Sequence, residues 1–173
     1  MSQAPRIDAA YYIETLQMQR HIEGGAYKEH YRAALTLPHS SLSAAHQGAR
    51  NASTAIYFLL EHGEFSGFHK LASDEVLHFY DGAPMHVYEI DAAAQMHHHV
   101  LGRDLAAGQR FSLVIPGGHW FALRCETAQS FALIGCTVAP GFDFADFQMD
   151  DRASLLAQFP QHAQLITEMT FNR

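Results

Sequence analysis

Side chains that could exchange a proton with a ligand are concentrated in one segment, residues 63–82, which reads GEFSGFHKLASDEVLHFYDG and contains His69 and Glu75. An imidazole changes charge near neutral pH. A carboxylate buried among apolar groups has a raised pKa, which a nearby imidazole lowers again. Such a pair can move a proton at neutral pH, as an isomerase or epimerase requires. We therefore expect His69 to act as a base and Glu75 as its acid or orienting partner.

Two tyrosines near this segment, Tyr57 and Tyr80, are the expected proton donors. Side chains alternate between the two faces of a strand, so Glu75 and His78 belong to opposite faces unless a β-bulge intervenes. We expect His78 to contribute to ligand binding through such a bulge.

Short strands separated by turn residues must position these side chains. Gly and Pro mark the turns, as at Pro116-Gly117-Gly118 and Pro140-Gly141. Strands are predicted at 26–35, 54–60, 65–71, 75–80, 85–90, 97–101, 111–115, 119–124 and 130–138. Their even spacing within one domain favours an antiparallel sandwich or barrel. Helical periodicity predicts one helix over 8–20 and two short helices near the C-terminus, the first capped by Asp150 or Asp151 and ended by Pro160, the second over 162–169.

Composition narrows the class of protein. The chain has 173 residues, of which 48% are hydrophobic and 17% charged, as in a compact single domain. Lys and Arg number 11 against 18 Asp and Glu, a net charge of −7 that gives no reason to expect nucleic acid or an anionic membrane as a partner. No apolar stretch approaches the roughly 20 residues needed to span a bilayer, and residues 1–20 lack a signal-peptide pattern. We expect a cytoplasmic protein.

The segment 63–82 resembles the first motif of the cupin superfamily, in which a second His normally stands at the position of Leu71. The turn at 116–118 resembles the second motif, and Phe121 stands at the position of its His. Four longer blocks are similar to the cupin-5 family, a domain of unknown function (number 985): HIEGGAY at 21–27, TAIYFLL at 54–60, SDEVLHFYDG at 73–82 and GCTVAPGF at 135–142. The resemblance extends from about Asp8 to Thr170.

This resemblance implies an all-β fold, a double-stranded β-helix (cupin jelly-roll barrel), with an N-terminal helix and short C-terminal helices. One cupin domain is expected over 1–173, and a homodimer is the usual assembly. The resemblance implies no established reaction.

A metal site is an alternative that the resemblance raises. It places His69 and Glu75 at two of the usual metal-ligand positions, whereas the other two are apolar here. His119 shares a strand face with Phe121, so if Phe121 lines the barrel His119 does too. His69, Glu75 and His119 would then form a two-His, one-carboxylate set that suits Fe, Mn or Zn in an oxygenase or hydrolase. The metal-free hypothesis, with no cofactor, is the stronger of the two.

The leading hypothesis is a cupin that binds a small polar, sugar-like ligand in its barrel, with isomerase or epimerase chemistry. It rests on analogy with sugar epimerases of the same fold, and a fold does not imply a function. The other alternative is a ligand-binding cupin without catalysis. Beyond the acid–base residues, the expected ligand contacts are His78, His119, Phe121 and Phe58.

Overall fold

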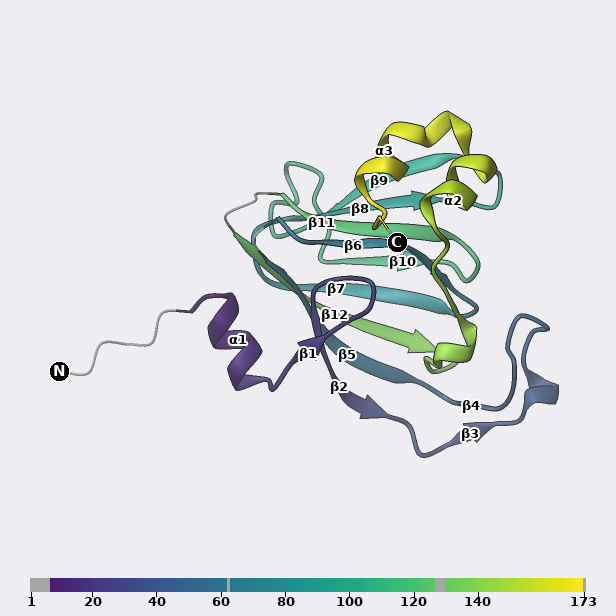
Figure 1. The fold of residues 1–173 in the computed structure, drawn as a ribbon. Coiled ribbons are helices and arrows are strands. Elements are labelled where there is room, and N and C mark those ends of the chain that lie inside the picture. The colour runs from purple at the N-terminus through teal and green to yellow at the C-terminus, as the bar shows by residue number, and fades with distance from the viewer. Residues whose placement is uncertain (1–6, 62, 127–129, 173) are drawn as a thin grey trace.

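The computed structural model describes residues 7–61, 63–126 and 130–172, and in them two antiparallel sheets face each other (Figure 1). The larger sheet has the order β1 (Gln19–Arg20), β2 (Ala26–Arg32), β5 (Thr54–Glu61), β12 (Phe131–Ala139), β7 (Asp74–Gly82), β10 (Ser112–Ile115). The smaller has the order β13 (Phe147–Gln148), β6 (Phe65–Leu71), β11 (Trp120–Cys125), β8 (Met85–Ile90), β9 (Met96–Leu101). A separate pair is formed by β3 (Thr36–Leu37) and β4 (Arg50–Asn51).

Alternation along the strands divides the interior into a filled end and an open end. At the filled end the inward side chains are large and apolar: Phe58, Leu60, Leu77, Met85, Val87 and Ile134. Burying each of them contributes about 1.5–3 kcal/mol to stability. The same inward rows continue toward the open end with Thr54 and Ile56 on β5, Glu75 on β7, and Cys136 and Val138 on β12. The filled end thus anchors the fold, and the open end can carry polar groups.

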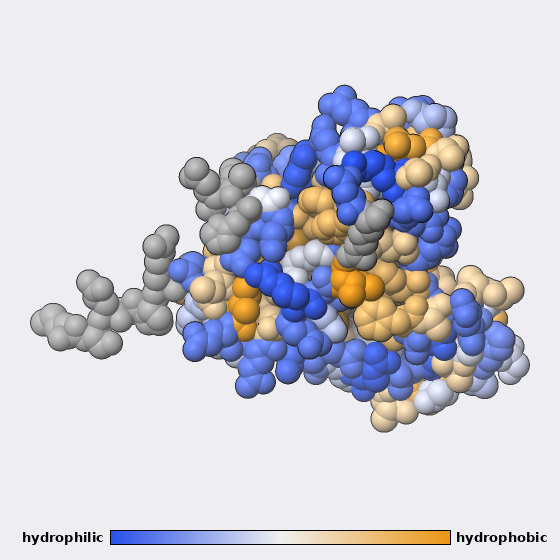
Figure 2. Space-filling view, in the orientation of Figure 1, coloured by the Kyte–Doolittle hydropathy of each residue, from blue (hydrophilic) through white to orange (hydrophobic). Residues whose placement is uncertain are grey.

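Helices cover parts of the two outer faces. Over the smaller sheet lie α2 (Arg152–Gln158), the 3-10 turn η3 (Pro160–His162) and α3 (Ala163–Glu168) (Figure 1). Leu155 and Ile166 from these helices pack against Trp120. On the larger sheet, Ala9 of α1 (Ala9–Thr15) packs against Leu59. On the face seen in Figure 2, apolar side chains show between the C-terminal helices and a hydrophilic lower border.

The predicted fold class is confirmed: the chain is an all-β barrel of two antiparallel sheets with an N-terminal helix and short C-terminal helices. The first helix ends at Thr15 rather than residue 20, because Gln17 adopts a φ of 54° and the chain then enters β1. Two 3-10 turns, η1 (His39–Ser41) and η2 (Phe144–Asp146), and the strand β13 were not predicted. The ends of the expected domain, including residues 1–6, lie outside the described residues. Among the described helices, none has the length and apolarity needed to cross a membrane.

Candidate functional site

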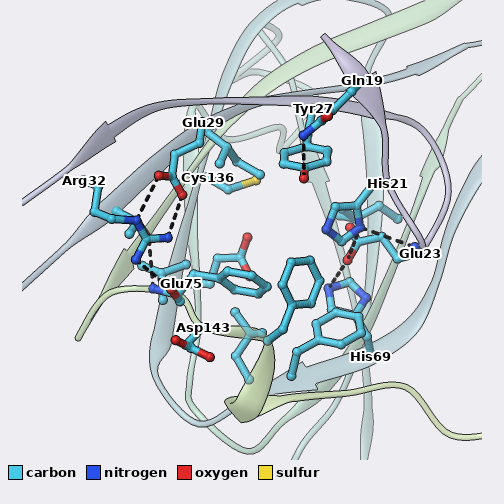
Figure 3. Close-up of a pocket in the computed structure, with 18 residues that line it drawn as sticks. Gln19, His21, Glu23, Tyr27, Glu29, Arg32, His69, Glu75, Cys136 and Asp143 are labelled. Carbon is cyan, nitrogen blue, oxygen red and sulfur yellow. Dashed lines mark hydrogen bonds and ion pairs between the residues drawn. The ribbon is translucent and has the colours of Figure 1, made fainter. Parts of the chain in front are cut away.

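The open end of the barrel contains a cavity of about 460 Å³, within the size range of small-molecule sites. Its apolar lining consists of Ile56, Leu71, Leu123, Val138, Phe142, Phe144 and Phe147. Its polar and ionisable lining consists of Gln19, His21, Glu23, Tyr27, Glu29, Arg32, Thr54, His69, Glu75, Cys136 and Asp143. Figure 3 shows Glu29 and Arg32 on one side of the cavity and His21, Glu23 and His69 on the opposite side.

His69 and Glu23 form a buried polar contact in the cavity. His69 Nε2 lies 3.3 Å from Glu23 Oε2, and the Ser66 hydroxyl donates to Glu23 Oε1 at 2.9 Å. His69 Nδ1 lies 2.8 Å from the carbonyl oxygen of Gly67. A carbonyl oxygen only accepts, so Nδ1 carries a proton and, in the neutral ring, Nε2 is the acceptor. A protonated Glu23 can therefore donate to His69.

The turn at Gly24-Gly25 brings Glu23 to this position. Gly25 has a φ of +72°, and a Cβ there would lie 2.6 Å from the carbonyl oxygen of Leu59. Only glycine adopts this conformation without strain or overlap. The Glu23 carbonyl also accepts a hydrogen bond of 2.8 Å from the Gly67 amide on β6. The turn is thus attached to the strand that carries His69.

Burial shifts the ionisation of the groups inside the cavity. Desolvation raises the pKa of Glu23 to about 7, although His21 and Ser66 counteract it. Desolvation also raises the pKa of Glu75 to about 7, against the opposing influence of His69 and a hydrogen bond with the Cys136 thiol. The pKa values of His69 and His21 are lowered, chiefly because burial disfavours the charged ring. Near neutral pH, two neutral imidazoles therefore accompany two carboxylic acids whose pKa values are raised toward neutrality.

At the mouth of the cavity, the charged side chains of Arg32 and Glu29 pair with each other. Arg32 donates to both carboxylate oxygens of Glu29, at 2.9 Å from Nε and 2.7 Å from Nη2. Its Nη1 group donates to Asn51 Oδ1 at 2.9 Å and to the carbonyl oxygen of Phe142 at 3.2 Å. The two-bond geometry is the strongest arrangement for an Arg–carboxylate pair.

Aromatic side chains from the segment 142–147 close one wall. The rings of His21 and Phe144 are stacked with centroids 6.0 Å apart, and Phe147 lies edge-on to His21 at 6.1 Å. An ion pair between Arg50 and Asp146 holds this segment, and both of its side chains are only 6% exposed. Charge pairing thus fixes the position of the aromatic wall.

Of the residues predicted for catalysis, His69 and Glu75 both line the cavity. Tyr57 and Tyr80 do not: they contact each other, with centroids 6.1 Å apart, on the outer face of the larger sheet. His78 is also on that face, 3.2 Å from Thr137 Oγ1. The pairing of β7 with β12 continues without a bulge from Glu75 to His78, so the bulge that His78 required is absent there.

The remaining predicted ligand contacts lie outside the cavity lining. Phe121 is buried against His69, with ring centroids 4.1 Å apart, and Phe58 belongs to the filled end of the core. His119 binds Glu89 through Nδ1 at 2.6 Å, so the structure does not bring it to His69 and Glu75. Within the described ranges, no three His, Cys, Asp or Glu side chains are arranged to hold a metal ion.

His21 and Glu23 line the cavity beside His69 but were not among the site residues predicted from the sequence. Glu23, in the turn before β2, contacts His69 on β6. Strand periodicity does not predict a contact between two segments so far apart in the sequence. The available signal was the Gly24-Gly25 pair, which indicates a turn with positive φ directly after Glu23.

Comparison with known proteins supports the fold and the family. The model of the family described as Cupin superfamily (DUF985) matches residues 10–150. The uncharacterized protein YML079W of Saccharomyces cerevisiae is 31% identical over 143 residues, which are 78% of this chain and 71% of that protein.

Solved structures give the same result. Protein SO0799 from Shewanella oneidensis superposes with a TM-score of 0.87 at 34% identity, covering 96% of this chain and 99% of the other. A hypothetical protein from Leishmania major superposes with a TM-score of 0.86 at 28% identity, covering 96% and 100%. A cupin 2 domain-containing protein from Halorhodospira halophila, at 15% identity and a TM-score of 0.55 over 90% and 88% of the two chains, shares the fold. The chain therefore belongs to the cupin-5 family (DUF985) of the cupin superfamily.

Proposed function

We propose that the cavity binds a small polar molecule and exchanges protons with it, in chemistry of the isomerase or epimerase type. The observation that supports this most strongly is the presence of two buried carboxylic acids, Glu23 and Glu75, in one ligand-sized cavity with His69. Both have a pKa of about 7, so each supplies an acid and a base form near neutral pH.

The geometry supports a division of roles. Glu75 comes from β7 and, when ionised, can remove a proton from a carbon of the ligand. Glu23 Oε2 lies 3.3 Å from His69 Nε2, and a protonated Glu23 can return a proton to the ligand at another position or on another face. One proton leaves the ligand and one is added, so the reaction needs no oxidant or reductant.

The test is deuterium exchange. Candidate ligands are first selected by binding, from neutral sugars, polyols and amines of this size. Each binder is then incubated in D₂O with the wild-type protein, Glu75→Gln or Glu168→Gln, and deuterium on carbon is measured by NMR. We expect exchange with the wild type and with Glu168→Gln, since Glu168 is an exposed residue of α3. Glu75→Gln should lower the exchange rate by about 10²-fold or more.

Binding without deuterium incorporation in the wild type would contradict the catalytic proposal. It would favour the alternative of a ligand-binding cupin without catalysis, because the cavity would then serve recognition alone.

We also propose that the chain forms a homodimer, which the family resemblance and the general frequency of twofold assemblies support. Light scattering on the purified protein tests this against the chain mass of 19.3 kDa. A mass near twice this value is expected, and a monomer at physiological concentration would contradict it.

A further inference from the structure

The charges that line the cavity are unbalanced. Glu23, Glu29, Glu75 and Asp143 contribute four carboxyl groups, and Arg32 is the single Lys or Arg among the described lining residues. Arg32 is occupied by its two hydrogen bonds to Glu29 and by two further acceptors. The described lining therefore offers no free cation to a ligand's phosphate or carboxylate.

The imidazoles do not supply the missing positive charge. His21 and His69 are side chains of low exposure, 7% and 3%, and burial favours their neutral forms. An anion in this cavity would lose its hydration and meet carboxylates instead of cations, which is strongly unfavourable. A cation would gain a charge partner from Glu23 or Glu75 in place of water.

The aromatic wall also favours a cation. Phe144 of this wall and Tyr27 of β2 both contact the His21 ring, at centroid distances of 6.0 Å and 4.7 Å. The His21 Nδ1 atom is 3.4 Å from Glu23 Oε2, so the wall adjoins a buried carboxyl group. The negative faces of aromatic rings attract ammonium groups.

We propose that the ligand of this cavity carries a positive charge, as a protonated amine held between the buried carboxyl groups and the aromatic wall. Phosphorylated, carboxylated and nucleotide-linked ligands are excluded by the same arrangement. This inference rests on the proposed function, because it specifies the class of molecule that the same site binds.

The test uses three probes of one shape and different charge: benzylamine, benzyl alcohol and benzoate. Titrations of the full chain are followed by ¹⁵N NMR, so that the binding site is located as well as the affinity measured. We expect benzylamine to bind about tenfold more tightly than benzyl alcohol, and benzoate more weakly than either. Glu75→Gln should lower the benzylamine affinity about tenfold, and Glu168→Gln should leave it unchanged.

A second variant should weaken the preference of the cavity for cations over anions. Glu29→Gln removes the carboxylate that occupies Arg32 and should raise the benzoate affinity about tenfold. An unchanged benzoate affinity in this variant would contradict the explanation that Glu29 prevents Arg32 from binding an anion.

The outcomes separate the two proposals. Benzoate binding in the cavity as tightly as benzylamine would overturn the charge inference and leave the cavity as a ligand site. Failure of all three probes to shift cavity resonances at their highest soluble concentrations would overturn both.

The pH dependence provides a further check. The groups that face the two carboxyls are His21, His69 and Cys136, and of these the thiol stays protonated because burial raises its pKa well above the ordinary value. Benzylamine should therefore bind more tightly at about pH 8 than at about pH 6, as Glu23 and Glu75 ionise. Equal affinities at the two pH values would contradict the assignment of these carboxyls as the amine's partners.

Discussion

His69 Nε2 faces Glu23 Oε2 at 3.3 Å, inside a cavity that also contains Glu75. The contact joins a strand of the smaller sheet to the turn that precedes β2 in the larger one. Because Gly67 fixes the proton of His69 on Nδ1, the remaining ring nitrogen is free to accept a proton from Glu23. The His69–Glu23 pair is thus suited to proton transfer at a pH where an exposed carboxyl group would be fully ionised.

Replacing the buried acids should stabilise the protein at high pH. Glu75 has a folded pKa of about 7, above its ordinary value of 4.5, so the folded state binds more protons than the unfolded state between these values. The contribution of Glu75 to the free energy of unfolding therefore falls as pH rises from about 4.5 to about 7. We expect Glu75→Gln to be roughly 1–3 kcal/mol more stable than wild type at about pH 8, and similar at about pH 5.

Denaturant unfolding at the two pH values measures this difference. Glu23→Gln should behave in the same direction, since its folded pKa is also raised to about 7. Glu168→Gln is the exposed control. A variant that is less stable than wild type at high pH would show that ionised Glu75 is stabilised rather than penalised by its surroundings.

The turn that positions Glu23 should tolerate no side chain at Gly25. The φ of +72° and the 2.6 Å approach of a Cβ to the Leu59 carbonyl oxygen both oppose Gly25→Ala. We expect a loss of about 2–4 kcal/mol in the free energy of unfolding, measured by denaturant titration. Gly108→Ala is the matched control, because Gly108 has a φ of +82° with nothing near an added Cβ, and should cost only about 1–2 kcal/mol. Equal losses in the two variants would mean that close packing at Gly25 contributes nothing.

The Arg50–Asp146 pair should be required for the aromatic wall. Both side chains are 6% exposed, and removing one charge leaves the other buried without its partner. Asp146→Ala should cost about 3–5 kcal/mol and weaken probe binding in the cavity. Glu168→Ala breaks an exposed pair with Arg124 and should cost less than about 1 kcal/mol. If a folded Asp146→Ala protein binds the probe as tightly as the wild type, the aromatic wall does not depend on this ion pair.

The two faces of the larger sheet should differ in function. Tyr80→Phe removes a hydroxyl group on the outer face, beside Tyr57, and should leave cavity binding and proton exchange within about twofold of wild type. The measurement is the deuterium exchange assay with the ligand selected for the wild type. A loss comparable to that of Glu75→Gln would return Tyr80 to the role of proton donor that the sequence suggested.

Strand spacing predicted an antiparallel sandwich or barrel, and the family resemblance predicted the cupin barrel and the joint placement of His69 and Glu75. His69 lies on β6, whose pairing with β11 shifts register between Ser66 and His69. Glu75 lies on β7, where side chains alternate regularly from Asp74 to His78 in the pairing with β12. The same alternation places Tyr80 on the outer face, opposite Glu75. The strand face on which Tyr80 lies therefore predicts its position better than its nearness to His69 and Glu75 in the sequence.

The contacts between distant segments were not predictable in this way. Glu23 reaches His69 through a turn whose attachment to β6 depends on tertiary structure. His119 was expected beside His69, but it binds Glu89 on a neighbouring strand at 2.6 Å. A spacing pattern specifies the face of a strand, whereas the partner of a side chain depends on which strands become neighbours.

The two buried carboxyl groups of the cavity, Glu23 and Glu75, should titrate near neutral pH. A ¹³C NMR titration of protein labelled at the glutamate carboxyl carbons measures this directly, with Glu23→Gln and Glu75→Gln used to assign the two resonances. Because the two groups interact, the apparent values describe the pair. We predict that both resonances titrate with a pKa of about 7. Titration of both near the ordinary value of about 4.5 would contradict the claim.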